Sequence, residues 1–121
     1  MPSIAGKISK FTKKEIDYLF HCARRVSRSS AAIILFAPRQ KDFSRILIIA
    51  AKKVGNAPER NKVRRRIKAL FYEEKLFNSL FDCVVIVHKK AVALPFEQLK
   101  GIFLGVYSKF STQKSYDDLA R

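Results

Sequence analysis

The sequence predicts one α+β domain in which helices pack on a single β-sheet. A chain of 121 residues has room for one modest hydrophobic core and is too short for two. Hydrophobic residues make up 48% of it, and they occur both at helical spacing and in short continuous runs typical of buried strands. We therefore expect a single domain over residues 1–121, an α-β sandwich with the order α-β-β-α-β-α built around a β-α-β unit.

The N-terminal part is expected to form a tail and one helix. Residues 1–10 are polar and basic, so we predict a loose tail. A helix should follow from Thr12, whose side chain suits the N-cap position, to Arg24. Its apolar side chains recur at helical spacing: Ile16, Leu19, Phe20 and Ala23. Residues 25–30, rich in Ser and Arg, read as a connection.

Two short apolar runs predict the first two strands. Residues 31–37 are apolar throughout, and Pro38 with the polar residues after it ends the run. Residues 45–51 form the second run after a short polar connection. Because they follow one another so closely, the two strands could pair as an antiparallel hairpin.

The longest helix follows a glycine-containing turn, residues 52–56. Gly55 permits a backbone conformation closed to other residues. Asn56, followed three residues later by Glu59, resembles a capping box, and Pro58 fits a first helical turn. The helix is expected to run to about Phe77.

One strand and one helix complete the expected fold. Residues 83–87 are continuously apolar and read as a buried strand. A last helix should open at residues 94–95 and run to about residue 110. Its apolar stripe comprises Phe96, Leu99, Phe103, Val106, Tyr107 and Phe110. We expect residues 112–121 to form a second flexible tail.

The charge balance indicates a polyanionic partner. Twenty-five Lys and Arg oppose ten Asp and Glu, which leaves a net charge of +15. Such a field attracts nucleic acids or anionic membranes. No apolar run approaches the roughly 18 residues that span a bilayer, and the N-terminus lacks the apolar stretch of a signal peptide. We therefore expect a cytoplasmic, nucleic-acid-binding protein without a membrane partner.

The long helix divides into an apolar stripe and a basic flank. At about 100° per residue, one side gathers Val63, Ile67, Leu70 and Phe71. The flank beside it, here called the basic shoulder, consists of Asn61, Arg64, Arg65 and Lys68. Seven cations lie between Lys52 and Arg66, and only Glu59 opposes them. Because like charges at i, i+4 destabilise a helix, this clustering indicates an anionic ligand that compensates them.

The sequence contains no recognisable catalytic or metal-binding constellation. Cys22 and Cys83 are isolated, and neither has a neighbour at zinc-ligand spacing. His21 and His88 have no apparent catalytic partner, and the ten acidic residues are scattered. We therefore expect the protein to hold no catalytic residue, no metal and no organic cofactor.

The segment around the long helix reads Lys52-Lys53-Val54-Gly55-Asn56-Ala57, then Arg60-Asn61-Lys62-Val63-Arg64-Arg65, then Ile67-Lys68. This pattern closely resembles the signature of the bacterial ribonuclease P protein component. Lys62 stands where that family usually has Arg, and Arg64 stands where it usually has Lys. A weaker resemblance covers nearly the whole chain, including Arg45 and residues 94–99.

The resemblance implies the accessory protein subunit of a ribozyme. The RNA subunit, with Mg²⁺ that it mainly binds itself, removes the 5′ leader from precursor tRNA. Catalytic RNA and precursor tRNA would be the partners, and DNA would not. The resemblance assigns RNA contact to Lys52, Lys53, Asn56, Arg60, Asn61, Arg64, Arg65 and Lys68. It also implies a rare left-handed β-α-β crossover, as in the second domain of ribosomal protein S5.

A cleft between the first helix and the sheet is implied for the single-stranded leader. On this chain it would be lined by Ile16, Phe20, Ile34 and Leu47. Ile16 occupies a position where the family often has Phe, which removes one stacking platform for a base. Leu47 and Ile49 stand where the family often has small residues, so the floor would be bulkier. Ordinary core packing is the alternative interpretation of all these side chains.

Three other functions compete with this interpretation. A ribosomal protein or general RNA chaperone is the second choice, because the same basic α+β architecture occurs there. A stand-alone nuclease is disfavoured by the scattered carboxylates. A DNA-binding regulator is disfavoured because the sequence suggests neither a helix-turn-helix nor a dimerisation zipper.

Overall fold

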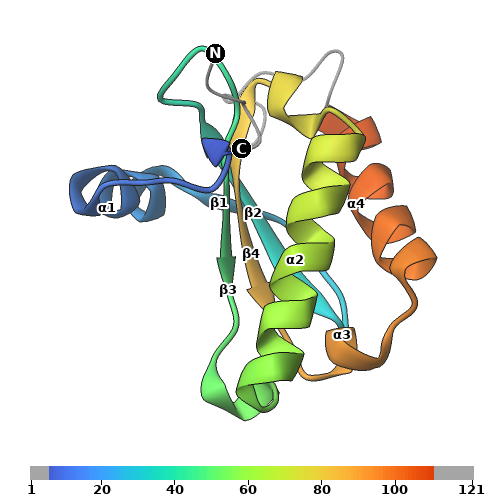
Figure 1. The fold of residues 1–121 in the computed structure, drawn as a ribbon. Helices are drawn as coiled ribbons and strands as arrows, with labels where there is room; N and C mark the ends of the chain where they lie inside the picture. Colours follow the sequence, from blue (N-terminus) through green and yellow to red (C-terminus); the bar gives the residue numbers. More distant parts are fainter. Residues whose placement is uncertain (1–5, 111–121) are drawn as a thin grey trace.

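The computed structural model describes residues 6–110, which form a four-stranded sheet with helices on both faces (Figure 1). The α+β class is confirmed. The helices and strands are α1 (Lys13–Cys22), β1 (Arg24–Arg28), β2 (Ala32–Pro38), β3 (Ile46–Ile49), α2 (Ala57–Glu73), β4 (Phe81–Val87), α3 (Lys90–Ala93) and α4 (Phe96–Phe110). Two short 3-10 turns flank α2, namely η2 (Lys52–Val54) and η3 (Leu76–Asn78).

The strand order is β1-β2-β4-β3, so the predicted hairpin between the first two apolar runs is wrong. β4 lies between them, antiparallel to β2 and parallel to β3. Proximity in sequence favours the hairpin, whereas β4, which is apolar except for Asp82, is buried best between two neighbours. The sequence of β1, Arg-Arg-Val-Ser-Arg, lacks a clear apolar alternation and predicts a connection instead of a strand. It pairs antiparallel with β2 at one edge of the sheet.

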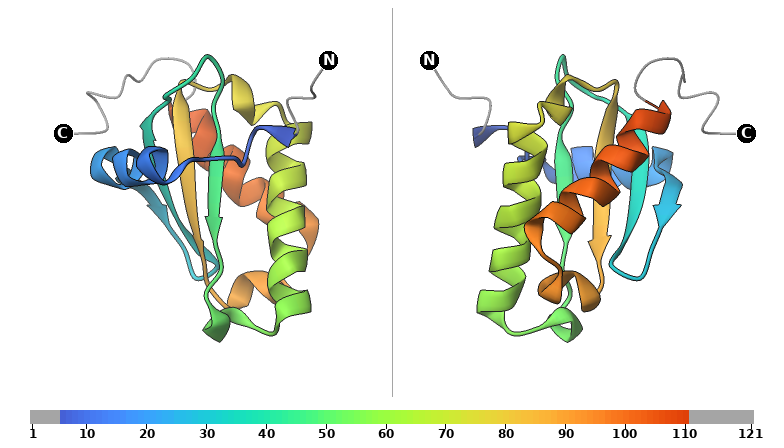
Figure 2. Two further views of the ribbon diagram at one scale, coloured as in Figure 1. Left: turned by 60° about the vertical axis from the view of Figure 1, so that its left-hand side comes forward. Right: turned by 90° about the vertical axis from the view of Figure 1, so that its right-hand side faces the viewer.

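The β-α-β unit consists of β3, α2 and β4. In the right-hand view of Figure 2, α2 and α4 lie toward the viewer, both parallel strands run downward, and β4 lies to the right of β3. This arrangement makes the crossover left-handed, whereas roughly 98% of such connections are right-handed. The handedness implied by the family resemblance is confirmed, and no local pattern in the sequence could have supplied it.

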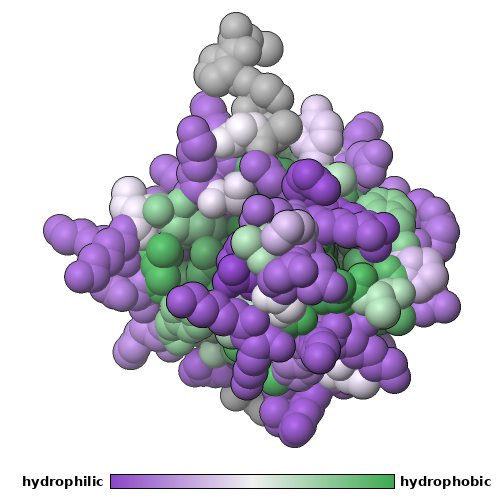
Figure 3. All heavy atoms as spheres, turned by 60° about the horizontal axis from the view of Figure 1, so that its bottom comes forward, coloured by the Kyte–Doolittle hydropathy of each residue, from purple (hydrophilic) through white to green (hydrophobic). Residues whose placement is uncertain are grey.

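The start of α2 is capped as predicted. The Asn56 side chain accepts a hydrogen bond from the Glu59 amide, and the Glu59 side chain accepts one from the Asn56 amide, each at 2.9 Å. Gly55 is extended, with φ 166°, so its predicted special backbone conformation is wrong. A Cβ at this position would lie 2.7 Å from Glu59 Oε1, so the glycine provides room for the cap. Hydrophilic side chains cover most of this end of the molecule (Figure 3).

α2 ends earlier than expected, because Lys75 adopts a left-handed backbone with φ 54°. A left-handed residue cannot continue an α-helix. The chain then makes the separate turn η3 before entering β4. The predicted single helix to about Phe77 is therefore two elements.

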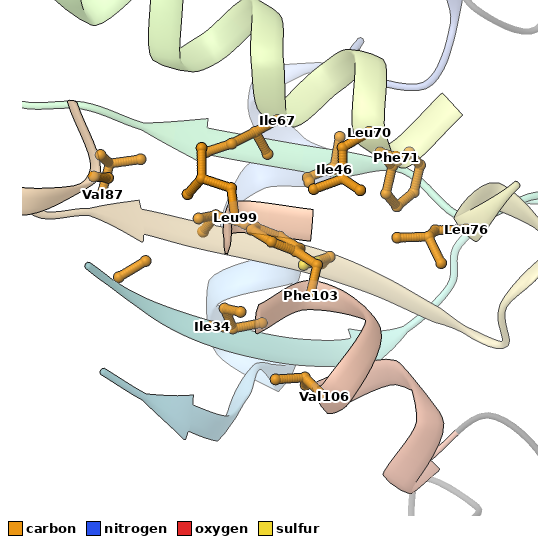
Figure 4. Close-up of a cluster of buried hydrophobic side chains, with 14 of the residues drawn as sticks. Ile34, Ile46, Ile67, Leu70, Phe71, Leu76, Val87, Leu99, Phe103 and Val106 are labelled. Carbon is orange, nitrogen blue, oxygen red and sulfur yellow. The ribbon is translucent and has the colours of Figure 1, made fainter. Parts of the chain in front are cut away.

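The main core lies between the sheet and the helices α2 and α4 (Figure 4). The predicted stripe of α2 is confirmed, with Val63, Ile67, Leu70 and Phe71 each at most 1% exposed. The predicted stripe of α4 also faces the core, most deeply at Leu99 and Phe103. From the sheet, Ile34, Phe36 and Ile46 complete this layer.

A second, smaller cluster lies on the opposite face of the sheet, which α1 crosses (Figure 2). Leu19 of α1 is fully buried there against Ala37 and Val84. Around it, several side chains remain partly exposed: Phe11, Cys22, Ala23, Leu35, Leu47, Ile49 and Ile86. α1 therefore covers this face of the sheet incompletely.

Residues 6–10 do not form the loose tail that was predicted. Ile8 is fully buried in the main core, and its carbonyl accepts a 2.7 Å hydrogen bond from the Ile46 amide. β3 is an edge strand, so its outward amide needs a partner that the sheet does not supply. One apolar residue among polar ones carries no periodic signal, which explains the wrong prediction. The rest of the two predicted tails, residues 1–5 and 112–121, lies outside the described residues.

Truncating Ile8 should destabilise the whole domain. We expect Ile8→Ala to lower the free energy of unfolding by about 2–5 kcal/mol, as for other fully buried side chains. The measurement is urea-induced unfolding followed by circular dichroism. Lys7→Ala, the exposed neighbouring position, serves as the control and should change stability little. Equal stability of the two variants would show that this segment does not belong to the core.

Candidate nucleic-acid interface

The basic shoulder lies beside the edge strand β3. Side chains from α2 and β3 enclose a groove of about 320 Å³ between them. It is lined by Arg64, Arg65 and Lys68 from α2, by Ile46, Leu47 and Ile48 from β3, and by Ser9. The structure thus brings three of the four shoulder residues to one groove, while Asn61 lies exposed one turn earlier on the helix.

The three cations of this groove carry uncompensated charge. Within residues 6–110, no carboxylate lies within ion-pair distance of any of them. Arg64 is partly buried, and its Nη2 donates to the Ala50 carbonyl at 3.3 Å, which holds the guanidinium toward the end of β3. Arg65 is exposed, and Lys68 is partly buried. A polyanion can approach all three from solvent, because the groove is open.

The other predicted RNA contacts lie at the start of the same helix. Lys52 and Lys53 are exposed in η2, directly before the cap. Asn56 is exposed, but its Oδ1 is engaged in the capping box, so its demonstrated role is structural. Arg60 is partly buried, and its Nε has no hydrogen-bond partner among the described residues. Basic side chains therefore run from η2 along α2 to Lys68.

Arg45 connects the elements that surround the second cluster, a role that no local pattern in the sequence predicts. It is 1% exposed, and its Nη1 donates to the Lys10 carbonyl at 2.7 Å and to Glu15 Oε1 at 3.0 Å. Its guanidinium lies 4.2 Å from the centroid of the Phe11 ring. Its backbone amide donates to Asp82 Oδ1 at 2.8 Å. Arg45 thus joins β3 to the N-terminal segment, to α1 and to β4.

The pKa values of the two carboxylates around Arg45 shift in opposite directions. The hydrogen bond from the Arg45 side chain, helped by the Thr12 amide, lowers the pKa of Glu15 from 4.5 to about 2. Burial raises the pKa of Asp82, and the hydrogen bond from the Arg45 amide opposes that rise only in part. Glu15 is therefore the charged partner that holds α1 on Arg45.

Three of the four predicted leader-cleft residues lie on the α1 side of the sheet. Phe20 is 45% exposed on α1, Ile16 is partly buried on the same helix, and Leu47 belongs to the second cluster. The assignment of Ile34 is wrong, because its side chain is fully buried in the main core on the opposite face. Its neighbour Leu35 lies on the α1 side instead. Successive residues of a strand point to opposite faces, and a fully apolar strand does not reveal which face is which.

Comparison with known proteins identifies the family. The sequence profile of the family described as Ribonuclease P matches residues 10–111. The chain belongs to the ribonuclease P protein family. It is 32% identical to the ribonuclease P protein component of Halalkalibacterium halodurans over 96 residues, which are 78% of this chain and 81% of that protein. It is 31% identical to the one of Phytoplasma australiense over 101 residues, which are 82% of this chain and 87% of that protein.

Solved structures of ribonuclease P proteins share the fold. The protein from Staphylococcus aureus superposes with a TM-score of 0.71 at 21% identity, covering 84% of this chain and 94% of that chain. The protein from Thermotoga maritima also gives 0.71, at 22% identity, covering 84% of this chain and 96% of that chain. At this level of identity the likeness concerns the fold alone.

Residues 6–110 contain neither a membrane-spanning helix nor a metal-binding cluster of side chains. In this part of the chain no helix has the length and apolar character needed to cross a membrane. The same residues include no group of three His, Cys, Asp or Glu side chains placed to hold a metal ion.

Acid should weaken the attachment of α1 to Arg45. Because the pKa of Glu15 is lowered, its charged form stabilises the fold fully above pH 4.5, and that contribution is lost as the pH falls toward about 2. We expect Glu15→Gln to reduce the loss of unfolding free energy between about pH 5 and pH 2, measured by urea unfolding at several pH values. Glu97→Gln, at an exposed position of α4, should leave the acid dependence unchanged. The same acid dependence in both variants would contradict the assignment.

Proposed function

We propose that this protein is the accessory subunit of ribonuclease P and that it binds the catalytic RNA through the basic shoulder and η2. The observation that carries the proposal is the groove beside β3, where Arg64, Arg65 and Lys68 converge with no carboxylate near them. Binding to phosphates would release the counterions of the RNA and relieve the repulsion between these cations. The planar donors of Arg suit phosphate oxygens, and the exposed Asn61 can reach a base edge or a 2′-OH.

The 5′ leader of precursor tRNA would bind on the other face of the sheet, beside α1. This proposal is supported by the incomplete cover of that face by α1, most of whose residues are exposed. Four apolar side chains of the sheet remain partly exposed there: Leu35, Leu47, Ile49 and Ile86. Phe20, at 45% exposure, offers a ring on which an unpaired base can stack. The two RNA partners would therefore bind on either side of the edge strand β3, where Leu47 borders both surfaces.

We assign the hydrolysis of the phosphodiester to the RNA subunit, with Mg²⁺ bound mainly by that RNA and with no organic cofactor. The contribution of the protein would be electrostatic, because its cations reduce the repulsion between the catalytic RNA and the precursor. Fewer Mg²⁺ ions would then be needed to bring the two RNAs together. We place the protein in the cytoplasm, where bacterial tRNA is matured.

Reconstitution tests the accessory role. The purified protein alone should leave precursor tRNA intact, whereas the protein with the cognate catalytic RNA at low Mg²⁺ should give 5′-matured tRNA. The cleavage products are resolved by gel electrophoresis, and the catalytic RNA alone at the same low Mg²⁺ is the control. Accurate cleavage by the RNA-free protein would refute the accessory role. Equal binding of unrelated structured RNAs, without stimulation of cleavage, would favour a general RNA chaperone.

Removing two cations from the groove should weaken RNA binding and its dependence on salt. For Arg64→Ala combined with Arg65→Ala, we expect the slope of log affinity against log salt to fall by roughly 1.4–1.8, because each phosphate contact contributes about 0.7–0.9. Affinity for the catalytic RNA is measured by filter binding at several salt concentrations. The control removes the same charge elsewhere, by Lys62→Ala on the opposite flank of α2 and Lys109→Ala on α4. A slope that fell equally in both double variants would mean that the groove is not the contact.

A further inference from the structure

An exposed tyrosine continues the basic shoulder by one helical turn. Tyr72 follows Lys68 by four residues and Arg65 by seven, so the three side chains lie on one face of α2. These three residues line a second groove of about 410 Å³, together with Gly6, Ile8 and Ala69. Because Arg65 and Lys68 also line the groove beside β3, the two grooves meet at these cations.

The ring of Tyr72 is held in place although it is exposed. The side chain is 41% exposed, and its ring stacks on Phe77 with centroids 5.8 Å apart and planes inclined by 28°. Phe77 is itself partly buried and packs against the main core. One side of the Tyr72 ring is therefore fixed by the protein, while the exposed part borders the groove. A ring fixed in this way loses little conformational entropy when a ligand stacks on it.

The chemistry of this groove matches one nucleotide of a single-stranded segment. Each such nucleotide combines a negative phosphate with a flat aromatic base. Arg65 and Lys68 are suited to the phosphate, and the fixed ring of Tyr72 is suited to the base. An anionic lipid or an acidic peptide would use the cations but gain little from a flat ring. Charge and ring together therefore favour RNA as the occupant.

We propose that Tyr72 is an RNA-binding residue that stacks on an unpaired base of the catalytic RNA, next to the phosphates bound by Arg65 and Lys68. This inference rests on the proposed function and adds a specific contact to it. The contact extends the RNA-binding surface beyond the basic signature, toward the C-terminal end of α2. It also contributes affinity that does not depend on salt, because stacking releases no counterions.

The proposal is tested by substitutions that distinguish the aromatic ring of Tyr72 from its apolar character. Tyr72→Leu, in the full-length protein, should weaken binding of the cognate catalytic RNA by roughly 5- to 150-fold, the effect of losing one base–aromatic stack. Tyr72→Phe should bind as the wild type does. The salt slope should be unchanged in Tyr72→Leu, whereas Arg65→Ala should lower it. Tyr18→Leu, at the 53% exposed tyrosine of α1, is the matched control and should have no effect.

The outcomes separate this inference from the proposed function. Wild-type affinity of Tyr72→Leu would overturn the stacking role and leave the ribonuclease P assignment intact. Absence of binding by the wild-type protein would overturn the assignment itself. Weakened binding by Tyr72→Phe as severe as that by Tyr72→Leu would also overturn the inference, since the ring would then not be the essential group.

Fluorescence provides a second measurement that does not rely on loss of affinity. The chain contains no Trp, so Tyr72→Trp introduces a single tryptophan, which can be excited at wavelengths that tyrosine does not absorb. Catalytic RNA alone should quench its emission by stacking, whereas Tyr18→Trp should stay unquenched. Quenching that required precursor tRNA would overturn the assignment to the catalytic RNA, and the absence of any quenching would overturn the stacking contact.

Discussion

The burial of one stripe of α2 is the constraint on which the rest of the interface depends. Val63, Ile67, Leu70 and Phe71 are each at most 1% exposed, so the helix cannot rotate on the sheet without exposing them. Each buried side chain of this kind is worth about 1.5–3 kcal/mol, whereas each like-charge pair on the helix costs only a few tenths. Packing therefore overrides the repulsion and holds Arg64, Arg65 and Lys68 beside β3.

A buried arginine organises the other face of the sheet. Arg45 reaches the Lys10 carbonyl and Glu15, while its backbone binds Asp82, so one residue fixes α1 and the N-terminal segment relative to β3 and β4. Two of its nitrogens have no hydrogen-bond partner in the described part of the chain, and the Phe11 ring lies against the guanidinium. Removing Glu15 from such a cation leaves buried charge without its counter-ion, which is costly. The position of α1, and with it the proposed leader surface, depends on this contact.

Helical periodicity and capping were reliable signals in the sequence, whereas the backbone of Gly55, the end of α2 and the pairing of strands were predicted wrongly. The capping box at Asn56 and the stripes of α2 and α4 were predicted correctly, because each depends on residues three or four positions apart. The hairpin was wrong and β1 was missed, because pairing depends on competition among strands and β1 has no apolar pattern. Ile34 was placed on the wrong face, because a strand buried on both sides shows no alternation.

The sequence by itself determined the class of the fold, the amphipathic division of α2 and the basic signature that points to RNA. These are properties of short segments, fixed by helical periodicity and by the charge of neighbouring residues. Only the tertiary structure decided the strand order and the roles of Ile8 and Arg45, whereas the left-handed crossover was implied by the family resemblance and confirmed by the structure. The tertiary structure also placed Tyr72 beside the cations, in a groove that the N-terminal segment helps to form. Each of these features joins residues that are distant in the chain. Contacts of this kind leave no periodic pattern among neighbouring residues, so the sequence does not reveal them.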